Sequence, residues 1–284
     1  MYLFKKAQDL RAHIQHIKSS NQRIGFVPTM GALHQGHVSL IQQSLSVCSH
    51  TICSVFVNPT QFNEASDLQK YPRTPAKDTE LLTSVGTDIL FLPEVDEVYP
   101  SGFESQIKVN FNGLDLQMEG AFRPGHFEGV AQVVHRLLEL TEPDVIFMGQ
   151  KDFQQCLIVR RMIEFLNLEV ELFVCPIIRT KEGLAMSSRN VLLSEEGKQK
   201  ALVLNRALAH AKVTLAEKDV SKVQEEVNVL FEQANVKLEY FDIVDGHNLE
   251  PITSFKTSNF IVACTAAWVE NVRLIDNMIL KGGF

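Results

Sequence analysis

The segment at residues 23–37 reads RIGFVPTMGALHQGH, and this stretch decides the fold. Its first five residues are apolar enough for a short buried strand, and a turn containing Gly31 and Gly36 follows. Hydrophobic residues then recur at helical spacing, beginning at Val38 and Ile41. A strand that passes through a glycine-containing turn into a helix is typical of one unit of an α/β sheet.

The same alternation continues through the first two thirds of the chain. Apolar, β-branched segments predict further strands at residues 51–57, 88–92, 144–148 and 170–175. Helical patterns fall between them at residues 75–85, 127–140 and 153–166. Strands that are apolar throughout are buried on both faces, as in a parallel sheet covered by helices. We therefore predict a doubly wound, mainly parallel, Rossmann-like α/β domain over residues 1–176.

The pattern changes after Pro176. Two charged helices and two strands are predicted there, at residues 194–217, 221–233, 237–244 and 259–263. We expect these elements to form a smaller C-terminal α+β domain over residues 177–284, with residues 177–193 as the connecting loop.

Composition excludes several classes of protein. The 284 residues carry 27 Lys and Arg against 34 Asp and Glu, a net charge of −7 that argues against broad binding of nucleic acid. Apolar runs stay well short of the ~20 residues of a membrane span, and the N-terminal residues lack the apolar stretch of a signal peptide. Five scattered cysteines without a C-x-x-C pair indicate reduced thiols. We expect a cytoplasmic protein that binds neither membrane nor nucleic acid.

Two histidines lie in the glycine-containing turn, at His34 and His37. The start of a helix offers unpaired N–H groups and a positive dipole, which suit phosphate, and two imidazoles there can donate hydrogen bonds to oxygens that gain charge. Ordinary turn histidines, or two ligands of a metal, are the alternatives. His13 and His16 have the same spacing in a polar helical stretch without glycine, and we expect both to be solvated.

Two further clusters contain amide and basic side chains. Asn58 and Gln61 follow the strand predicted at residues 51–57, and their amides suit a hydroxyl or a carboxylate of a ligand. A plain turn is the alternative for them, as it is for Asp78. Arg123 and His126 precede a predicted helix, where they suit either an anion or helix capping.

The remaining clusters lie at residues 149–155 (GQKDFQQ) and 183–190 (GLAMSSRN). In the first, Gly149 permits close approach of a ligand, Lys151 offers a charge for phosphate, and Asp152 suits a helix cap, a sugar hydroxyl or a metal. A capped helix with a surface lysine is the alternative. The second has small hydroxyls beside an arginine, which suits a loop that closes over phosphates, and a flexible linker is the alternative.

Three of these clusters follow predicted strands that end near Val27, Val57 and Met148. Ligands of open α/β sheets bind beyond the carboxyl ends of the strands. We therefore expect the clusters to form one composite site.

Together the clusters resemble the pantoate–β-alanine ligase (pantothenate synthetase) family of the H-x-G-H nucleotidyltransferase superfamily. The similarity rests on six segments in order: PTMGALHQGH, VNPTQF, DLQKYPR, FRPGHFEGV, GQKDFQQ and GLAMSSRN. The resemblance implies an ATP-dependent condensation of pantoate with β-alanine. Pantoyl adenylate would form with release of pyrophosphate, and the amine of β-alanine would then displace AMP to give pantothenate. Mg²⁺ would neutralise the pyrophosphate, and the protein would be a homodimer.

The resemblance also implies roles for individual residues. The predicted ATP-binding residues are Met30, His34, His37, Gly149, Gln150, Lys151, Asp152, Ile178, Met186, Ser187, Ser188 and Arg189. Among them, the predicted catalytic residues are His34, His37, Lys151, Ser187 and Arg189. The predicted contacts of pantoate and β-alanine are Asn58, Gln61, Arg123, His126 and Gln155, and Asp78 is assigned to phosphate-bound Mg²⁺. We expect the histidines to act mainly by stabilising charge.

Three positions depart from the family pattern. Gln150 stands where many members carry an acidic residue, Phe153 where tyrosine is common, and Asn63 where glycine is frequent. None of these changes removes a group that the chemistry needs. Another member of the superfamily, or a nucleotide-binding scaffold without activity, remains the alternative function.

Overall fold

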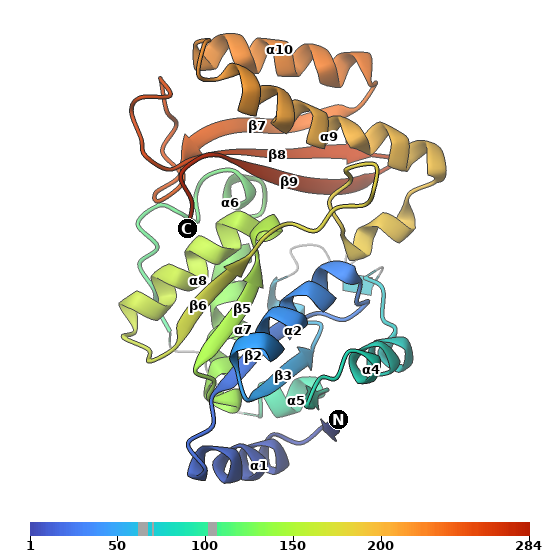
Figure 1. Cartoon of the computed structure of the whole chain (residues 1–284), viewed down its shortest axis with the longest axis vertical. Coiled ribbons are helices and arrows are strands. Elements are labelled where there is room, and N and C mark those ends of the chain that lie inside the picture. The colour runs from blue at the N-terminus through green and yellow to red at the C-terminus, as the bar shows by residue number, and fades with distance from the viewer. Residues whose placement is uncertain (62–67, 70, 102–106) are drawn as a thin grey trace. The chain divides into compact units, whose positions relative to one another are not determined.

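The computed structural model describes residues 1–61, 68–69, 71–101 and 107–284. The chain divides into two compact units (Figure 1). Unit 1 comprises Met1–Gly149 and Gln154–Pro176, and unit 2 comprises Gln150–Phe153 and Ile177–Phe284. Four residues of the predicted Lys151 cluster therefore pack with the C-terminal part of the chain, a feature that the sequence did not indicate.

Unit 1 contains a parallel sheet of six strands. They are β1 (Tyr2–Phe4), β2 (Ile24–Thr29), β3 (His50–Val55), β4 (Ile89–Phe91), β5 (Val145–Gly149) and β6 (Glu171–Cys175). Their order in the sheet is β1-β4-β3-β2-β5-β6, and each neighbouring pair is parallel. The predicted Rossmann-like parallel sheet is confirmed, with one addition: the short edge strand β1 was not predicted, because Tyr2 and Leu3 are exposed and show no buried apolar run.

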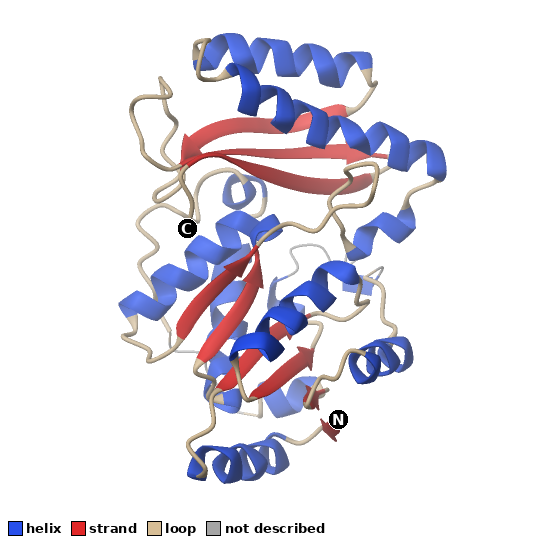
Figure 2. Ribbon diagram, in the orientation of Figure 1, coloured by secondary structure: helices blue, strands red, loops and turns tan. Residues whose placement is uncertain are grey.

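Helices connect these strands and cover the sheet on both faces, with α2 in front of it and α7 behind it (Figures 1 and 2). The helices are α1 (Ala7–Ser19), α2 (Gln35–Val47), α4 (Pro75–Ser84), α5 (Val95–Val98), α6 (Glu119–Phe122), α7 (His126–Thr141) and α8 (Phe153–Phe165), with a 3-10 turn η1 at Pro59–Gln61. Because both faces are covered, strand residues such as Val27, Cys53, Leu90 and Phe147 are buried in one core.

The strand order places a topological switch point beside β2. The chain runs from β2 to β3 and β4 on one side, and it continues with β5 and β6 on the other side of β2. In such sheets the connections that leave neighbouring strands in opposite directions open a crevice at the carboxyl ends of the strands. The turn after β2 and the end of β5 at Gly149 both lie at this position.

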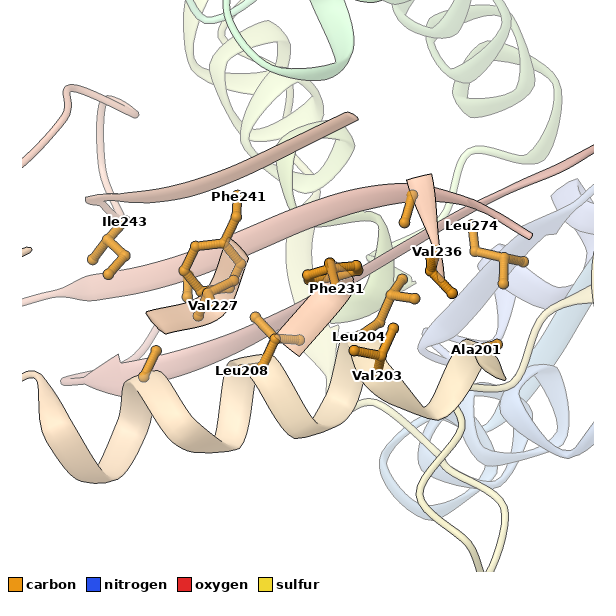
Figure 3. Close-up of a cluster of buried hydrophobic side chains, with 14 of the residues drawn as sticks. Ala201, Val203, Leu204, Leu208, Val227, Phe231, Val236, Phe241, Ile243 and Leu274 are labelled. Carbon is orange, nitrogen blue, oxygen red and sulfur yellow. The ribbon is translucent and has the colours of Figure 1, made fainter. Parts of the chain in front are cut away.

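Unit 2 contains an antiparallel sheet of three strands and two long helices. The strands are β7 (Lys237–Asp245), β8 (Ile261–Val269) and β9 (Val272–Lys281), in that order, and the helices are α9 (Glu195–Thr214) and α10 (Val220–Gln233). Figure 3 shows side chains of both helices, among them Leu208 and Phe231, packed with the strand residues Phe241 and Leu274. The predicted α+β character is confirmed, whereas β9 and the part of β8 after Ala263 were not predicted.

Among the described residues, no helix is both long and apolar enough to span a membrane.

Candidate active site

The two histidines of the turn after β2 form a reciprocal cap at the start of α2. His34 Nδ1 accepts a hydrogen bond from the backbone N–H of Gly36 at 3.1 Å, and His37 Nδ1 accepts from the backbone N–H of His34 at 3.2 Å. The ring centroids lie 4.1 Å apart. The pair therefore satisfies two N–H groups that the first turn of a helix leaves without a partner.

This cap determines which ring nitrogen carries the proton. A neutral imidazole has one donor and one acceptor nitrogen, and in both rings Nδ1 is the acceptor. The proton of His34 and that of His37 are therefore on Nε2, which makes each ring a hydrogen-bond donor at that atom. Two donors at a helix N-terminus are suited to an anion, as the sequence predicted.

Asp78 of α4 holds the backbone of the same turn. Its side chain is only 2% exposed, and its two carboxylate oxygens accept hydrogen bonds from the N–H groups of Ala32 (3.0 Å) and Leu33 (2.8 Å). Thr74 Oγ1 donates a third bond, at 3.2 Å. Ala32 has a φ of 49°, a left-handed conformation that is unfavourable for alanine, so this support offsets a local strain. The sequence analysis missed this role, and the predicted contact with Mg²⁺ stays a prediction.

Two predicted site residues from neighbouring strands meet beside this turn. Met30 follows β2 and Gln61 follows β3, and Gln61 Nε2 donates to Met30 Sδ at 2.9 Å. Their strands are paired along their whole length, from Ile24 opposite His50 to Thr29 opposite Val55. The expectation that clusters at the ends of these strands come together is confirmed for this pair.

Asn58 supports Gln61 from within the protein. It is 1% exposed, and its Nδ2 donates to Gln61 Oε1 at 3.3 Å and to the carbonyl of Gly129 at 3.2 Å. Its Oδ1 accepts from the hydroxyl of Tyr99 at 3.1 Å. Burial raises the pKa of Tyr99 to about 12, so this hydroxyl remains a donor at neutral pH. Asn58 thus positions the Gln61 side chain, and its predicted contact with substrate stays a prediction.

Arg123 and His126 hold the backbone of Gln61. The carbonyl of Gln61 accepts from His126 Nδ1 at 2.9 Å and from Arg123 Nη2 at 3.3 Å, while Arg123 Nη1 lies 3.2 Å from His126 Nε2. A guanidinium only donates, so His126 Nε2 is the acceptor and Nδ1 carries the proton. The alternative of side-chain capping is wrong, because Gly125 is the N-cap residue of α7 and the helix start has no side-chain cap. Direct contact of either side chain with substrate stays a prediction.

In unit 2, the predicted phosphate-binding lysine lies in the 3-10 turn η2 (Gln150–Asp152). Lys151 Nζ is 3.7 Å from the carboxylate of Asp152, and the lysine side chain is the more buried of the two, at 20% exposed against 48%.

Gln155 of α8, in unit 1, is half-buried. Its neighbour Gln154 is buried and donates to the carbonyl of Leu114 at 2.6 Å, which gives Gln154 a structural role.

The loop that was predicted to close over phosphates is folded. The N–H of Met186 donates to the carbonyl of Ile178 at 2.9 Å, and the N–H of Thr180 donates to the carbonyl of Leu184 at 2.8 Å. Ser187 Oγ then accepts from the N–H of Arg189 at 3.2 Å at the start of the 3-10 helix η3 (Ser188–Leu192). These hydrogen bonds give the segment a defined conformation, and its closing over phosphates stays a prediction.

The predicted site residues divide between the two units. Unit 1 brings together Met30, His34, His37, Asn58, Gln61, Asp78, Arg123 and His126, and it also contains Gly149 and Gln155. Unit 2 contains Gln150, Lys151, Asp152, Ile178, Met186, Ser187, Ser188 and Arg189. Asn63, one of the three departures from the family pattern, lies outside the described residues.

The second pair of histidines, in α1, is placed differently from expectation. His13 is half-buried, and its ring lies 4.7 Å from the ring of Tyr2 and 5.3 Å from that of Phe4. The expectation that it is solvated is wrong, because the unpredicted strand β1 runs beside it. His16 is exposed, as expected.

The six-stranded parallel sheet and the histidine-capped turn that begins α2 define the class: this is an α/β protein with a Rossmann-like domain. The family model for pantoate-beta-alanine ligase matches residues 2–279. A pantothenate synthetase of Bacteroides thetaiotaomicron is 42% identical over 282 residues, 99% of each chain. That of Cytophaga hutchinsonii is 43% identical over 276 residues, 96% of this chain and 97% of the relative.

Solved structures agree. Pantothenate synthetase from Thermus thermophilus superposes with a TM-score of 0.93 at 37% identity, covering 99% of this chain and 100% of that one. Pantoate-beta-alanine ligase from Francisella tularensis, solved with β,γ-ATP and β-alanine, gives a TM-score of 0.82 at 32% identity, with 100% and 99% covered. The chain belongs to the pantoate-beta-alanine ligase family. It is therefore an enzyme, a ligase of pantothenate biosynthesis.

Proposed function

We propose that the protein condenses pantoate with β-alanine at the expense of ATP and forms pantothenate, AMP and pyrophosphate. The reaction has two steps. A pantoate carboxylate oxygen attacks the α-phosphorus of ATP, and the bond from that phosphorus to the bridging oxygen breaks, so pyrophosphate leaves with the electron pair. The amine of β-alanine then attacks the carbonyl of pantoyl adenylate, and AMP leaves as the amide forms and the amine gives up a proton.

The observation that carries the proposal is the reciprocal histidine cap at the switch point of the sheet. Both steps build negative charge on phosphate oxygens, and donors fixed in advance stabilise such charge without reorganising. His34 and His37 supply two Nε2–H donors at the positive end of α2, and Asp78 fixes the turn that carries them. In this role the histidines stabilise charge, and neither step requires them to transfer a proton.

We propose that Gln61 binds pantoate through its amide. Its side chain is anchored by Asn58 and its backbone by Arg123 and His126, so the amide meets the substrate in a fixed position. A neutral amide orients a carboxylate nucleophile without the strong attraction of a cation, which would weaken its attack. Gln155, on α8, is proposed as the second pantoate contact.

We propose that residues of unit 2 also bind ATP. Lys151, Ser187 and Arg189 would bind phosphate oxygens, and an arginine beside small hydroxyls suits such binding. Ile178 would line the adenine pocket, and the N–H of Met186 donates to its carbonyl oxygen, which holds the backbone there. Gly149, at the end of β5, would allow close approach of the nucleotide.

We propose that Mg²⁺ enters the site bound to the phosphates of ATP. Among the described residues, no three His, Cys, Asp or Glu side chains come together as a metal site. Mg²⁺ typically binds through one or two carboxylates plus substrate phosphates, where it neutralises the leaving pyrophosphate. We further propose that the protein forms a homodimer, as the resemblance implies. We also propose that it is cytoplasmic, because its scattered cysteines indicate reduced thiols.

Two assays test the proposed function. Exchange of labelled pyrophosphate into ATP should require pantoate, and formation of AMP should in addition require β-alanine. Pyrophosphate exchange in which β-alanine does not stimulate the formation of AMP would indicate a nucleotidyltransferase that stops at the adenylate. If folded protein shows no exchange with pantoate, the proposal fails, and a nucleotide-binding scaffold is the better description.

A further inference from the structure

The turn that carries Lys151 is held by strand β9 of the same unit. Asn277 of β9 is 2% exposed, and its Nδ2 donates to the carbonyl oxygens of Gln150 (2.9 Å) and Lys151 (2.8 Å). Its Oδ1 accepts from Gln150 Nε2 at 3.0 Å. One buried amide therefore holds two consecutive carbonyl groups and one side chain of the turn.

A buried ion pair fixes Asn277 itself. Asp276 is 4% exposed and accepts from Arg179 Nη1 at 2.6 Å, from Arg179 Nη2 at 2.9 Å, and from the backbone N–H of Asn277 at 2.8 Å. Arg179 Nη2 also donates to the carbonyl of Asn277 at 3.3 Å. Burial raises the pKa of the Asp276 carboxyl, and the Arg179 guanidinium opposes that shift. The backbone N–H and the carbonyl of Asn277 are thus both hydrogen-bonded to this ion pair.

The same arginine reaches the loop at residues 183–190. Arg179 Nη1 donates to the carbonyl of Gly183 at 3.2 Å, and Arg179 forms a β-bridge with Ala185. The middle of β9 thus supports two of the segments to which the proposed function assigns ATP binding.

We propose that Asn277 is a positioning residue for Lys151, with the Asp276–Arg179 pair as its support. The inference rests on the proposed function, in which Lys151 binds phosphate oxygens of ATP. Loss of Nδ2 removes the side-chain donor of two carbonyl groups of the turn, at a position where Asn277 itself is 2% exposed, so the turn moves to find other partners. The lysine amine moves with it, and a displacement of about 1 Å at a reacting group is enough to cost about 10²-fold in rate.

Gln150 is the second part of this arrangement. The family resemblance places an acidic residue at this position in many members, whereas here an amide meets the amide of Asn277. The Gln150→Glu substitution would replace the Nε2 donor with a carboxylate oxygen that faces Asn277 Oδ1, an acceptor. Two acceptors repel each other, so this substitution should disturb the turn and displace the Lys151 amine without removing the lysine.

The test measures kcat/KM for ATP at saturating pantoate and β-alanine. Asn277→Ala should lower it by about 10- to 100-fold, and Gln150→Glu by several-fold. Leu274→Ala is the matched control: it lies on the same strand, loses core packing, and should lower stability without lowering kcat/KM of the folded enzyme. Unfolding of each variant is followed by the fluorescence of Trp268, the one tryptophan of the chain.

A double-mutant cycle separates positioning from general damage. If Asn277 acts through Lys151, Asn277→Ala should cause almost no further loss in a Lys151→Ala background. Losses that multiply would overturn the inference, as would an unchanged kcat/KM in Asn277→Ala when Lys151→Ala lowers it. If Lys151→Ala itself has no effect, the proposed role of Lys151 fails first. Should Asn277→Ala not fold, the same cycle with Gln150→Glu decides the question.

Discussion

Two pairs of histidines in this chain share a spacing and differ in everything else. His13 and His16 lie within α1, where the ring of the first packs beside Tyr2 and the second is exposed. His34 and His37 lie at the first turn of α2 and cap each other's backbone. The helix interior satisfies its own N–H groups, whereas the helix start does not. Spacing alone therefore carries no chemistry, and the position along the helix decides what an imidazole does.

The largest difference between the pairs should appear in the adenylation step. His37→Ala or His34→Ala removes one Nε2–H donor and should lower kcat of pyrophosphate exchange by about 10²–10³-fold, because fixed donors act on charge that develops in the transition state. His13→Ala and His16→Ala are the controls and should change exchange by less than about twofold. Equal losses in both pairs would contradict the assignment of the site.

The second effect concerns the support of the turn that carries His34 and His37. Asp78→Asn keeps one carbonyl acceptor for the turn but replaces the other with a donor that faces a backbone N–H, of either Ala32 or Leu33. We expect kcat to fall by about tenfold or more, since the turn shifts, together with a loss of about 1–3 kcal/mol in unfolding free energy. Kinetics and chemical denaturation measure the two. Full activity with reduced stability would show that the turn tolerates movement.

A third substitution separates capping from catalysis within His34. Asparagine is a strong N-cap residue, so His34→Asn should keep the start of α2. Its free energy of unfolding should be about 1 kcal/mol higher than that of His34→Ala. It lacks the Nε2–H donor, and its pyrophosphate exchange should be as slow as that of His34→Ala. If His34→Asn retains wild-type exchange, capping is the whole function of this histidine.

The smallest effect is on stability and involves His13. Burial lowers the pKa of His13 from its ordinary 6.5, with smaller contributions from His16 and His50. Between the two pKa values the unfolded chain binds more protons than the folded chain. The contribution of His13 to stability is therefore complete above the ordinary pKa of 6.5 and is lost as pH falls through the lowered pKa of the folded state. Between pH 7 and pH 5, His13→Gln should lose less unfolding free energy than the wild type. An identical pH dependence would show that the pKa of His13 is the same in the folded and unfolded states.

The sequence predicted the elements whose neighbours are local. Most strands and helices of unit 1 were recognised because their apolar runs are continuous, and the order of the clusters indicated the family. Strand β1 and the short helices α5 and α6 were not predicted. Strand β9 was missed because Asp276 and Asn277 interrupt its apolar pattern in the middle, where a polar pair usually marks a turn. The structure shows the reason for the interruption: both side chains are buried against Arg179 and the Lys151 turn.

The site shows the same division. His34, His37, Met30 and Gln61 were singled out from residues near them in the chain, and their roles in the site stay predictions. The roles of Asp78 and Asn58 were not, since Asp78 bonds to residues 45 and 46 positions away and Asn58 to residues 41 and 71 positions away. A single sequence has no signal for such pairs, because either partner alone resembles an ordinary turn residue.

The path of the chain through the two units limits how the protein can be dissected. The backbone leaves unit 1 after Gly149, contributes four residues to unit 2, and returns at Gln154. A fragment expressed from Ile177 onward would lack the turn that Asn277 binds, and would expose that buried amide. Cutting at the apparent boundary therefore damages both pieces, and a separately folding C-terminal fragment would need residues 150–153 supplied through a circularly permuted or grafted design.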